Sequence, residues 1–346
     1  MFYDYPEFQQ WERGPRIVAV GGGTGLSTML RGLKRYTKNL SAIVTVADDG
    51  GGSGVLRRDM GMLPPGDIRH CMEALANTEP IMEQLLTYRF SEGTLAGQSF
   101  GNLFLAALNG VTGSFEEAGR QMSRVLAVTG EIIPVTGADV QLEAVFENRS
   151  RVVGESAICA FKKAQNCRID HVALIPERPA AMPSALRAIR EADLILLGPG
   201  SLYTSIIPNL LVEEVAAELV RAQAPKLYIC NIMTQEGETE GYTAADHVEA
   251  LLAHGGAGLV DMCLANSAPV PSGLVEKYRE ESAAPLRVDR DRLAALGLEV
   301  VECPVADTRG NYARHDPEKL AGAILEIYRS RTVRIFKGSR RYVLED

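Results

Sequence analysis

Residues 46 to 70 hold the densest set of polar groups in the chain, "VADDGGGSGVLRRDMGMLPPGDIRH". Two adjacent acids, Asp48 and Asp49, follow an apolar run and precede three glycines. Adjacent residues of a strand point to opposite faces. We therefore expect one carboxylate to face a ligand and the other to anchor the loop or bind a hydrated Mg²⁺. A third acid, Asp67, either caps the helix that follows it or contacts the ligand.

A glycine-rich turn near the N-terminus joins an apolar run to a helical pattern, "VAVGGGTGLSTML". Bare glycines let backbone N–H groups approach an anion, and a helix N-terminus adds partial positive charge. The turn predicts a phosphate or nucleotide site, with a purely structural turn as the alternative. It matches neither the dinucleotide pattern G-x-G-x-x-G nor the P-loop, since no lysine follows the glycines. The expected contacts are Gly21, Gly22, Gly23, Thr24 and Gly25.

Two further polar loops follow strand-like runs later in the chain, "LILLGPGSLYTS" and "YICNIMTQEGETEGYT". In open α/β sheets, ligands bind at the carboxyl ends of the strands, so we expect these loops to border the same crevice. A solvated loop without a ligand is the alternative for the second. The candidate contacts in the two loops are Gly198, Gly200, Ser201, Thr204, Asn231 and Thr234.

No nucleophile or general base can be assigned from the residue types. The six cysteines are spread singly, with no C-x-x-C pair, which is typical of reduced structural thiols. His70 follows Asp67 closely, but a lone histidine in a helical segment is more often packed or exposed than catalytic. The catalytic residues, if the protein has any, stay unknown at this point.

Strand-like and helical segments alternate along the chain, which predicts an α/β fold with a mostly parallel central sheet. The stretch between Val140 and Val172 is β-like and polar, and we expect a hairpin excursion there, as an inserted lobe. The run from Ser201 to Ala222 predicts one helix, and "DP" at Asp316 predicts the start of the last long helix. We expect a flexible tail over 1–14, one domain over 15–331 and a peripheral tail over 332–346.

The composition fits a globular protein, with 346 residues of which 46% are hydrophobic and 23% charged. The formal net charge of −8 argues against a general nucleic-acid surface, which needs a basic footprint. The N-terminus shows no charged-then-apolar leader, and no apolar run is long enough to span a membrane. We therefore expect a cytoplasmic protein with no membrane span.

Six segments, in this order, resemble the gluconeogenesis factor family, the YvcK-like proteins, which is related to 2-phospho-L-lactate transferase (CofD). They are "GGGTGLSTMLRGLK", "VTVADDGGGSGVLRRDMGMLPPGDIRHC", "SFGNLFLAAL", "GPGSLYTSIIPNLL", "YICNIMTQEGETEGYTAADHV" and "RHDPEKLA". The resemblance implies a Rossmann-like three-layer α/β/α fold. It also implies a cytoplasmic bacterial protein that binds a nucleotide sugar, UDP-N-acetylglucosamine, and is needed for cell shape (morphogenesis) and growth on gluconeogenic carbon sources.

The resemblance also carries ligand positions onto this chain. By motif they fall on the Gly21–Gly25 turn, the Asp48 loop, Asn102, and the turn from Gly198 to Ser205. Tyr278 and Arg314 look like the family's contacts to the sugar nucleotide. Without the resemblance Arg314 is unremarkable, although its guanidinium suits a diphosphate.

Two classes of function remain for such a protein. The first is a non-catalytic regulator that senses a nucleotide sugar and passes its bound state to a protein partner. The second is an Mg²⁺-dependent phosphoester transferase of the CofD type, with Asp48 and Asp49 at the metal. A nicotinamide oxidoreductase is weakened by the absent dinucleotide pattern. The sequence leaves open the partner, the presence of Mg²⁺, the roles of the tails and whether the protein is a homo-oligomer.

Overall fold

The computed structural model describes residues 14–339. The expected N-terminal tail, apart from Gly14, and residues 340–346 lie outside this described part. The centre of the molecule is a sheet of seven parallel strands in the order β10-β9-β8-β7-β1-β2-β3. The strands are β1 Ile17–Gly21, β2 Leu40–Val44, β3 Glu131–Pro134, β7 Leu194–Leu197, β8 Lys226–Ile229, β9 Met262–Asn266 and β10 Glu299–Cys303.

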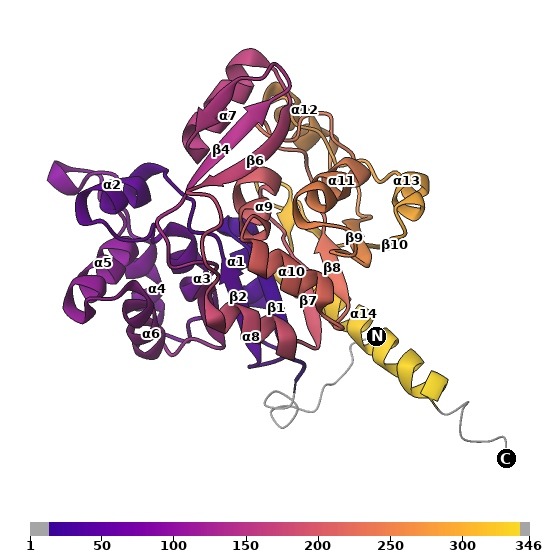
Figure 1. The fold of residues 1–346 in the computed structure, drawn as a ribbon, viewed down its shortest axis with the longest axis horizontal. Helices are drawn as coiled ribbons and strands as arrows, with labels where there is room; N and C mark the ends of the chain where they lie inside the picture. The colour runs from indigo at the N-terminus through magenta and orange to yellow at the C-terminus, as the bar shows by residue number, and fades with distance from the viewer. Residues whose placement is uncertain (1–13, 340–346) are drawn as a thin grey trace.

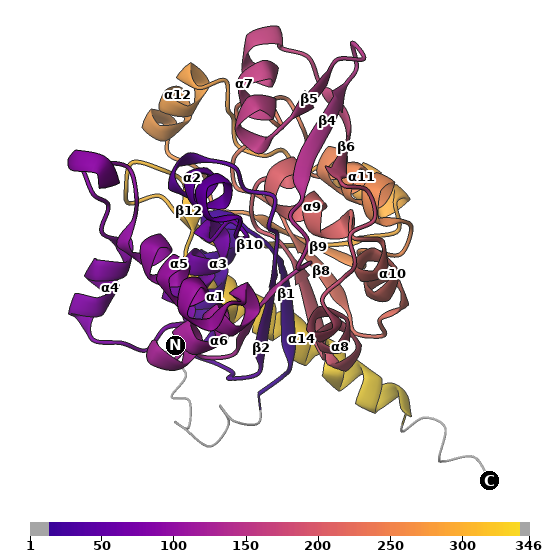
Figure 2. The same cartoon turned by 60° about the vertical axis from the view of Figure 1, so that its left-hand side comes forward.

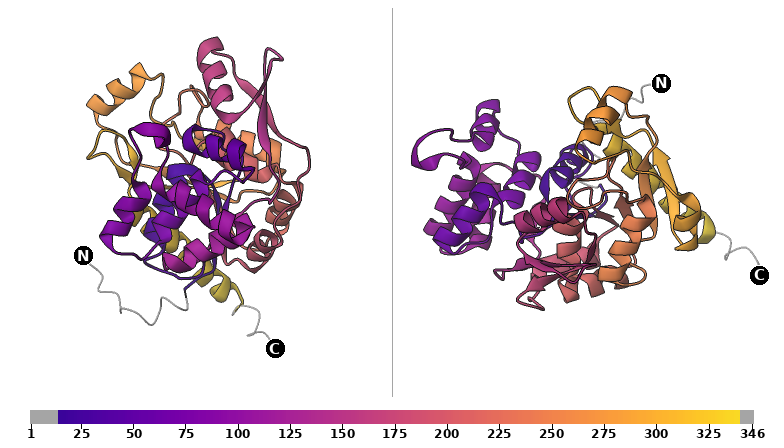
Figure 3. Two further views of the ribbon diagram at one scale, coloured as in Figure 1. Left: turned by 90° about the vertical axis from the view of Figure 1, so that its left-hand side faces the viewer. Right: turned by 90° about the horizontal axis from the view of Figure 1, so that it is seen from above.

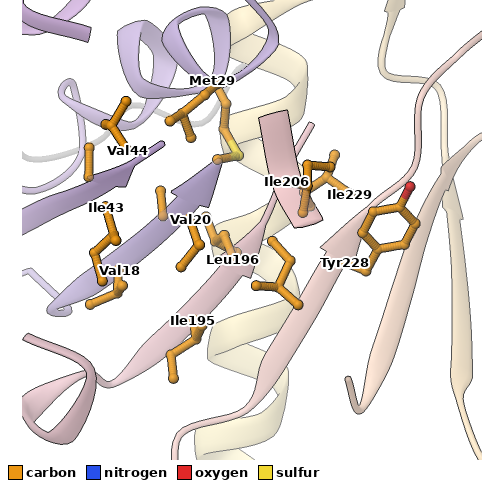
Figure 4. Close-up of a cluster of buried hydrophobic side chains, with 14 of the residues drawn as sticks. Val18, Val20, Met29, Ile43, Val44, Ile195, Leu196, Ile206, Tyr228 and Ile229 are labelled. Atoms are coloured by element: carbon orange, nitrogen blue, oxygen red, sulfur yellow. The ribbon is translucent and has the colours of Figure 1, made fainter. Parts of the chain in front are cut away.

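Helices cover both faces of this sheet, so its inner strands are apolar on both sides. Figure 4 shows the buried side chains of the inner strands, among them Val18, Val20 and Ile195. One face carries α1 (Gly23–Leu33), α3 (Gly66–Leu75) and α14 (Pro317–Ser339). The other carries α8 (Pro183–Glu191), α9 (Ile207–Leu210), α10 (Glu213–Arg221) and α11 (Ala244–Gly255), as can be followed in Figure 1. The predicted three-layer α/β/α fold is confirmed.

A helical group between β2 and β3 stands at one side of the sheet, as the right-hand view of Figure 3 shows. It consists of α2 (Gly51–Met60), α4 (Pro80–Thr87), η1 (Gly93–Leu95), α5 (Phe100–Thr112) and α6 (Phe115–Val125). Ser99 caps α5 by accepting a hydrogen bond from Asn102 N–H, and Ser114 caps α6 in the same way.

The inserted lobe differs in detail from the predicted hairpin. It contains three antiparallel strands in the order β5-β4-β6, and a helix. These are β4 Gln141–Phe146, β5 Arg151–Val153, α7 Glu155–Gln165 and β6 Ile169–Ile175. Gly154, with φ +101°, ends β5 and starts α7. The segment "RVVGESAICA" therefore changes from strand to helix at Gly154 instead of continuing as a strand.

The predicted single helix after Ser201 is divided into a π-helical turn η2 (Leu202–Ile206), α9 and α10. The remaining elements are α12 Ser272–Glu280, α13 Arg290–Ala295, β11 Ala306–Asp307 and β12 Arg314–His315. The predicted start of the last helix is confirmed, because Asp316 Oδ1 accepts hydrogen bonds from the N–H groups of Glu318 and Lys319. That helix continues to Ser339, beyond the expected domain end at 331. Over residues 14–339, no helix combines the length and apolar character needed to cross a bilayer.

Candidate functional site

The site lies where the strand order reverses. The chain builds the sheet outward from β1 through β2 to β3, and outward from β7 through β8 and β9 to β10. The loops that leave the carboxyl ends of β1 and β7 therefore diverge over a crevice, which is where open α/β sheets bind ligands. A cavity of about 490 Å³ occupies this place.

Most of the predicted ligand contacts line the cavity. They are Gly22, Gly23, Thr24, Gly25, Gly200, Ser201, Asn231, Thr234, Tyr278 and Arg314. They come from segments up to about three hundred residues apart in sequence, and the fold brings them to one edge of the sheet. Pro199 and Ser205 of the predicted turn and Gln235 of the predicted loop also line it. The structure adds lining residues that were not among the predicted contacts: Thr28, Ile232, Met233, Tyr312, Ala313 and His315.

The first wall of the cavity is the N-terminus of α1. Gly22 is the N-cap residue and supplies no side chain to the free N–H groups of the first turn, so these remain available to an anion. A Cβ at Gly25 would lie 2.6 Å from the carbonyl oxygen of Pro199, so only glycine lets the two loops meet this closely. A Cβ at Gly22 would lie 2.4 Å from Asp67 Oδ2. The glycines of "GGGTG" therefore allow close packing as well as access to the backbone.

The second wall is the loop after β7, which side chains of the next loop hold in place. Asn231 Nδ2 donates to the Gly200 carbonyl at 2.8 Å, and the Gly200 N–H donates to Asn231 Oδ1 at 3.2 Å. Ser201 Oγ donates to Gln235 Oε1 at 2.8 Å. Thr204 does not line the cavity but donates to Glu238 Oε1 at 2.7 Å. The polar residues of "NIMTQEGETEG" therefore shape the glycine loop.

Tyr278, Tyr312 and Arg314 form the outer wall. The Tyr278 hydroxyl accepts a hydrogen bond from the Ala313 N–H at 3.2 Å. The Arg314 guanidinium lies 5.2 Å from the centre of the Tyr312 ring, a cation–π contact. Figure 2 shows β12, which carries Arg314, beside α1. A positive charge thus faces the helix N-terminus across the cavity. The sequence contains Tyr312 two positions before Arg314, but nothing in the local pattern marks it as a cavity residue.

His315 lines the cavity from its inner side. Burial lowers the pKa of His315 to about 4, although a hydrogen bond to the backbone of Cys230 opposes the shift. The ring is therefore neutral near pH 7, and the positive charge of the cavity comes from Arg314 alone among its lining residues.

The two adjacent acids hydrogen-bond to different partners, but they lie in the loop after β2, which ends at Val44, and the alternation expected of strand residues does not apply to them. Asp48 Oδ1 accepts a hydrogen bond from Gly50 N–H at 2.8 Å. Asp49 Oδ1 accepts from both the N–H and the hydroxyl of Ser156, each at 3.0 Å, and so caps α7 of the lobe. The two carboxylates therefore have no common partner. Among residues 14–339, no group of three histidine, cysteine or acidic side chains is arranged to hold a metal.

The N-cap interpretation of Asp67 is wrong. The N-cap residue of α3 is Pro65, and Asp67 lies in the first turn of the helix without capping it. Its carboxyl instead packs against Gly22, close to the cavity. Because the proline and glycine before it already begin the helix, the acid is free to face the first glycine loop.

Carboxyls gather beneath the cavity, and the sequence did not predict this group. Burial, together with the nearby carboxyls of Asp48, Asp67 and Glu238, raises the pKa of Glu155 to about 9. Burial likewise raises the pKa of Glu238 to about 7 and the pKa of Asp48. Glu155 belongs to the inserted lobe and the other three to the main body, so no local pattern could have revealed their proximity.

Like Asp48, Asp49, Asp67 and Thr204, three further predicted contacts lie outside the cavity wall. Asn102 is buried in the helical group, where its Oδ1 accepts a hydrogen bond from Arg69 Nε at 2.8 Å. Gly21 is the last residue of β1 and Gly198 directly follows β7, so each lies at the start of one of the two loops. The cysteines of the chain are all free thiols, and Cys71, Cys230 and Cys263 are buried as expected from their apolar surroundings.

Known proteins share this architecture and sequence. The family model described as 2-phospho-L-lactate transferase CofD matches residues 17–306. The gluconeogenesis factor of Bacillus subtilis (strain 168) is 48% identical over 314 residues, covering 90% of this chain and 98% of the relative. The chain belongs to the gluconeogenesis factor family.

Other family members agree along almost the full length. The gluconeogenesis factor of Halalkalibacterium halodurans is 44% identical over 311 residues, covering 90% of this chain and 95% of the relative. A crystal structure of a UPF0052 family member from Bacillus halodurans superposes with a TM-score of 0.86 at 43% identity, covering 89% of this chain and 99% of that chain. The resemblance drawn from the six sequence segments is confirmed, and so is the fold expected for the family.

Proposed function

We propose that this protein binds a nucleotide diphosphate sugar, UDP-N-acetylglucosamine, as a regulator in the cytoplasm. The observation that carries the proposal is the meeting of two glycine-rich loops, at Gly25 and Pro199, opposite Arg314. Backbone N–H groups at a helix N-terminus suit one phosphate, and a guanidinium suits the other. A cavity of about 490 Å³ has the size of a site for a small nucleotide ligand.

Different walls of the cavity contact different parts of the ligand. The diphosphate lies between the first turn of α1 and the loop held by Asn231. Tyr278 and Tyr312, which line the outer wall, contact the sugar or the base. Asp48, Asp49 and Asp67 do not line the cavity, although Asp67 packs against Gly22 of the first wall.

The test is a calorimetric titration with UDP-N-acetylglucosamine, with and without Mg²⁺, followed by analysis of the recovered nucleotide. We expect saturable binding without Mg²⁺ and an intact ligand. Arg314→Ala should weaken binding by tenfold or more, since a charge-assisted contact contributes about 1.5–3 kcal/mol. Arg309→Ala is the matched control, because Arg309 is exposed, lies outside the cavity wall and pairs with Asp307. No binding to the wild-type protein at millimolar ligand would remove the proposal.

A CofD-type transferase is the second candidate, favoured by the description of the family model that matches residues 17–306. It predicts that the recovered nucleotide is cleaved and that cleavage needs Mg²⁺. The separate orientations of Asp48 and Asp49 weigh against a metal held by this pair.

The name shared by the relatives, gluconeogenesis factor, supports a role in growth on gluconeogenic carbon sources. We propose that ligand binding supports growth on gluconeogenic carbon sources and normal cell shape, through a protein partner that reads the bound state. A strain that carries only the Arg314→Ala protein should then behave like a deletion strain on such carbon sources, and a strain with Arg309→Ala should grow normally. Normal growth of both strains would separate ligand binding from the growth phenotype.

A further inference from the structure

A groove of about 560 Å³ follows the outer edge of the central sheet. Its floor is β3, which is the last strand of the sheet and pairs on one side only, with β2. One side of the groove is α6, with Arg120 and Arg124, and the other side is the start of α8, with Arg187. An edge strand that stays open is a template for pairing with another segment, and proteins usually cover it.

The groove combines apolar contacts with unpaired positive charge. Its apolar lining includes Val128, Ile132 and Met182, all half-buried. Arg120 is paired with Glu116 and Glu117 on its own helix. The guanidinium groups of Arg124 and Arg187 have no ion-pair or hydrogen-bond partner among residues 14–339. Glu131, at the start of β3, is the exposed acid of the lining that lies outside α6. An occupant with aromatic and acidic side chains would match this surface.

The chain enters the described part of the structure on the same side of the sheet. The Gly14 carbonyl accepts a hydrogen bond from Asn39 Nδ2 at 2.8 Å, just before β2 begins. A smaller hollow of about 240 Å³ extends from Asn39 to Gly130 and Glu131. Gly130 and Glu131 also line the groove. A continuous path therefore leads from Gly14 to the N-terminal end of β3.

We propose that residues 1–13, "MFYDYPEFQQWER", occupy this groove and cover the edge of the sheet. Thirteen residues can span about 43 Å, whereas the four residues of β3 extend over about 13 Å, so the segment can cross below β2 and still follow β3. Its five aromatic residues match the apolar lining, and two of its three acids, Asp4 and Glu7, match Arg124 and Arg187. Because the segment is covalently joined to Gly14, it is already held near the groove and its binding is intramolecular.

The direction of the segment follows from the tether. The segment would leave the groove at the N-terminal end of β3 and continue into β1, which is parallel to β3. Inside the groove it must therefore run antiparallel to β3. Antiparallel addition at an edge is a common way to cover it. The upper end of β3 is already closed, because Met182 N–H donates to the Val135 carbonyl at 3.1 Å. Pro6 is compatible with a segment whose outer side faces solvent.

Trp11 makes the proposal measurable in the full-length protein, because it is the only tryptophan of the chain. We expect acrylamide to quench its fluorescence severalfold less in the native protein than in a synthetic peptide of residues 1–13, with blue-shifted emission. The double variant Arg124→Glu/Arg187→Glu should raise quenching to the level of the peptide. Adding Asp4→Arg/Glu7→Arg to that variant should restore the protection. Arg221→Glu, at an exposed arginine on α10, is the control and should change nothing.

Three results would overturn the proposal. Equal quenching in the native protein and the peptide would show that the segment is undocked. Protection that survives the double variant would place the segment elsewhere. Protection that falls on dilution would show that the groove takes the segment of a second copy instead of its own. Circular dichroism of each variant establishes that the body stays folded, so loss of protection reports on the groove.

Discussion

Asn231 and Gly200 hold each other through two hydrogen bonds, one in each direction between the side-chain amide and the backbone of the glycine. The amide reproduces the pairing that a neighbouring strand would give, and it does so at the cavity wall. The shape of the loop after β7 therefore depends on a side chain from the loop after β8.

We expect Asn231→Asp to weaken ligand binding. The variant keeps the acceptor for Gly200 N–H but places a carboxylate oxygen against the Gly200 carbonyl, so the loop must move. The free energy of unfolding should fall by about 1–3 kcal/mol, the cost of a lost buried partner. Urea unfolding and calorimetric titration measure the two effects. Unchanged affinity in a folded variant would show that the loop does not contact the ligand.

Gly25→Ala should damage the site directly, at the contact between its first two walls. Its Cβ would meet the Pro199 carbonyl at 2.6 Å, so the helix and the loop must separate. We expect a loss of about 1–3 kcal/mol in stability, as for other overpacked positions, together with loss of ligand binding. Gly110→Ala is the control, because a Cβ at this helical position meets nothing within 4 Å and should stabilise α5. Equal behaviour of the two variants would contradict the close approach.

The sheet and the glycine loops could be predicted because their signals are local. Apolar runs that end in glycine predict buried strands followed by tight turns, and the structure has β1 and β7 at these places. The position of Asp316 before a proline likewise predicts the start of α14. In each case the residues that determine the element lie within a few positions of one another.

The roles of the acids could not be predicted, because they depend on contacts across the fold. Asp49 reaches Ser156, 107 positions later, and Glu155 meets carboxyls from the main body. Asp67 misled the prediction for a different reason. Its spacing suits an N-cap, but Pro65 already occupies that position. Tyr312 belongs to the cavity only through the path of the chain between β11 and β12.

Asp49→Ala should loosen the lobe and leave the cavity intact. The residue caps α7 from a distant segment, so its loss should cost about 1 kcal/mol, as for other N-caps, and raise amide hydrogen exchange in α7. Asp49→Asn keeps an acceptor and should behave like the wild type. Asp59→Ala, at an exposed acid of α2, is the control. A tenfold or larger loss of ligand affinity in Asp49→Ala would instead place this carboxylate in the ligand or metal site.

The buried carboxyls predict how stability depends on pH. In the unfolded chain a glutamate has a pKa of about 4.3, whereas burial raises the pKa of Glu155 to about 9 in the folded protein. Between these values the folded state binds more protons than the unfolded state. The contribution of Glu155 to stability is therefore present below about pH 4 and is lost progressively as the pH rises to about 9.

Glu155→Gln removes this titration and keeps the size of the side chain. The difference in the free energy of unfolding between variant and wild type should grow in favour of the variant from about pH 5 to about pH 9, because only the wild type must hold a proton or bury a charge. Urea unfolding at several pH values gives the curve. Glu92→Gln, at an exposed glutamate of the helical group, should give a flat difference. A flat difference for Glu155→Gln as well would mean that Glu155 ionises without cost beside Asp48 and Glu238, and that the carboxyls beneath the cavity are neutralised by a bound cation.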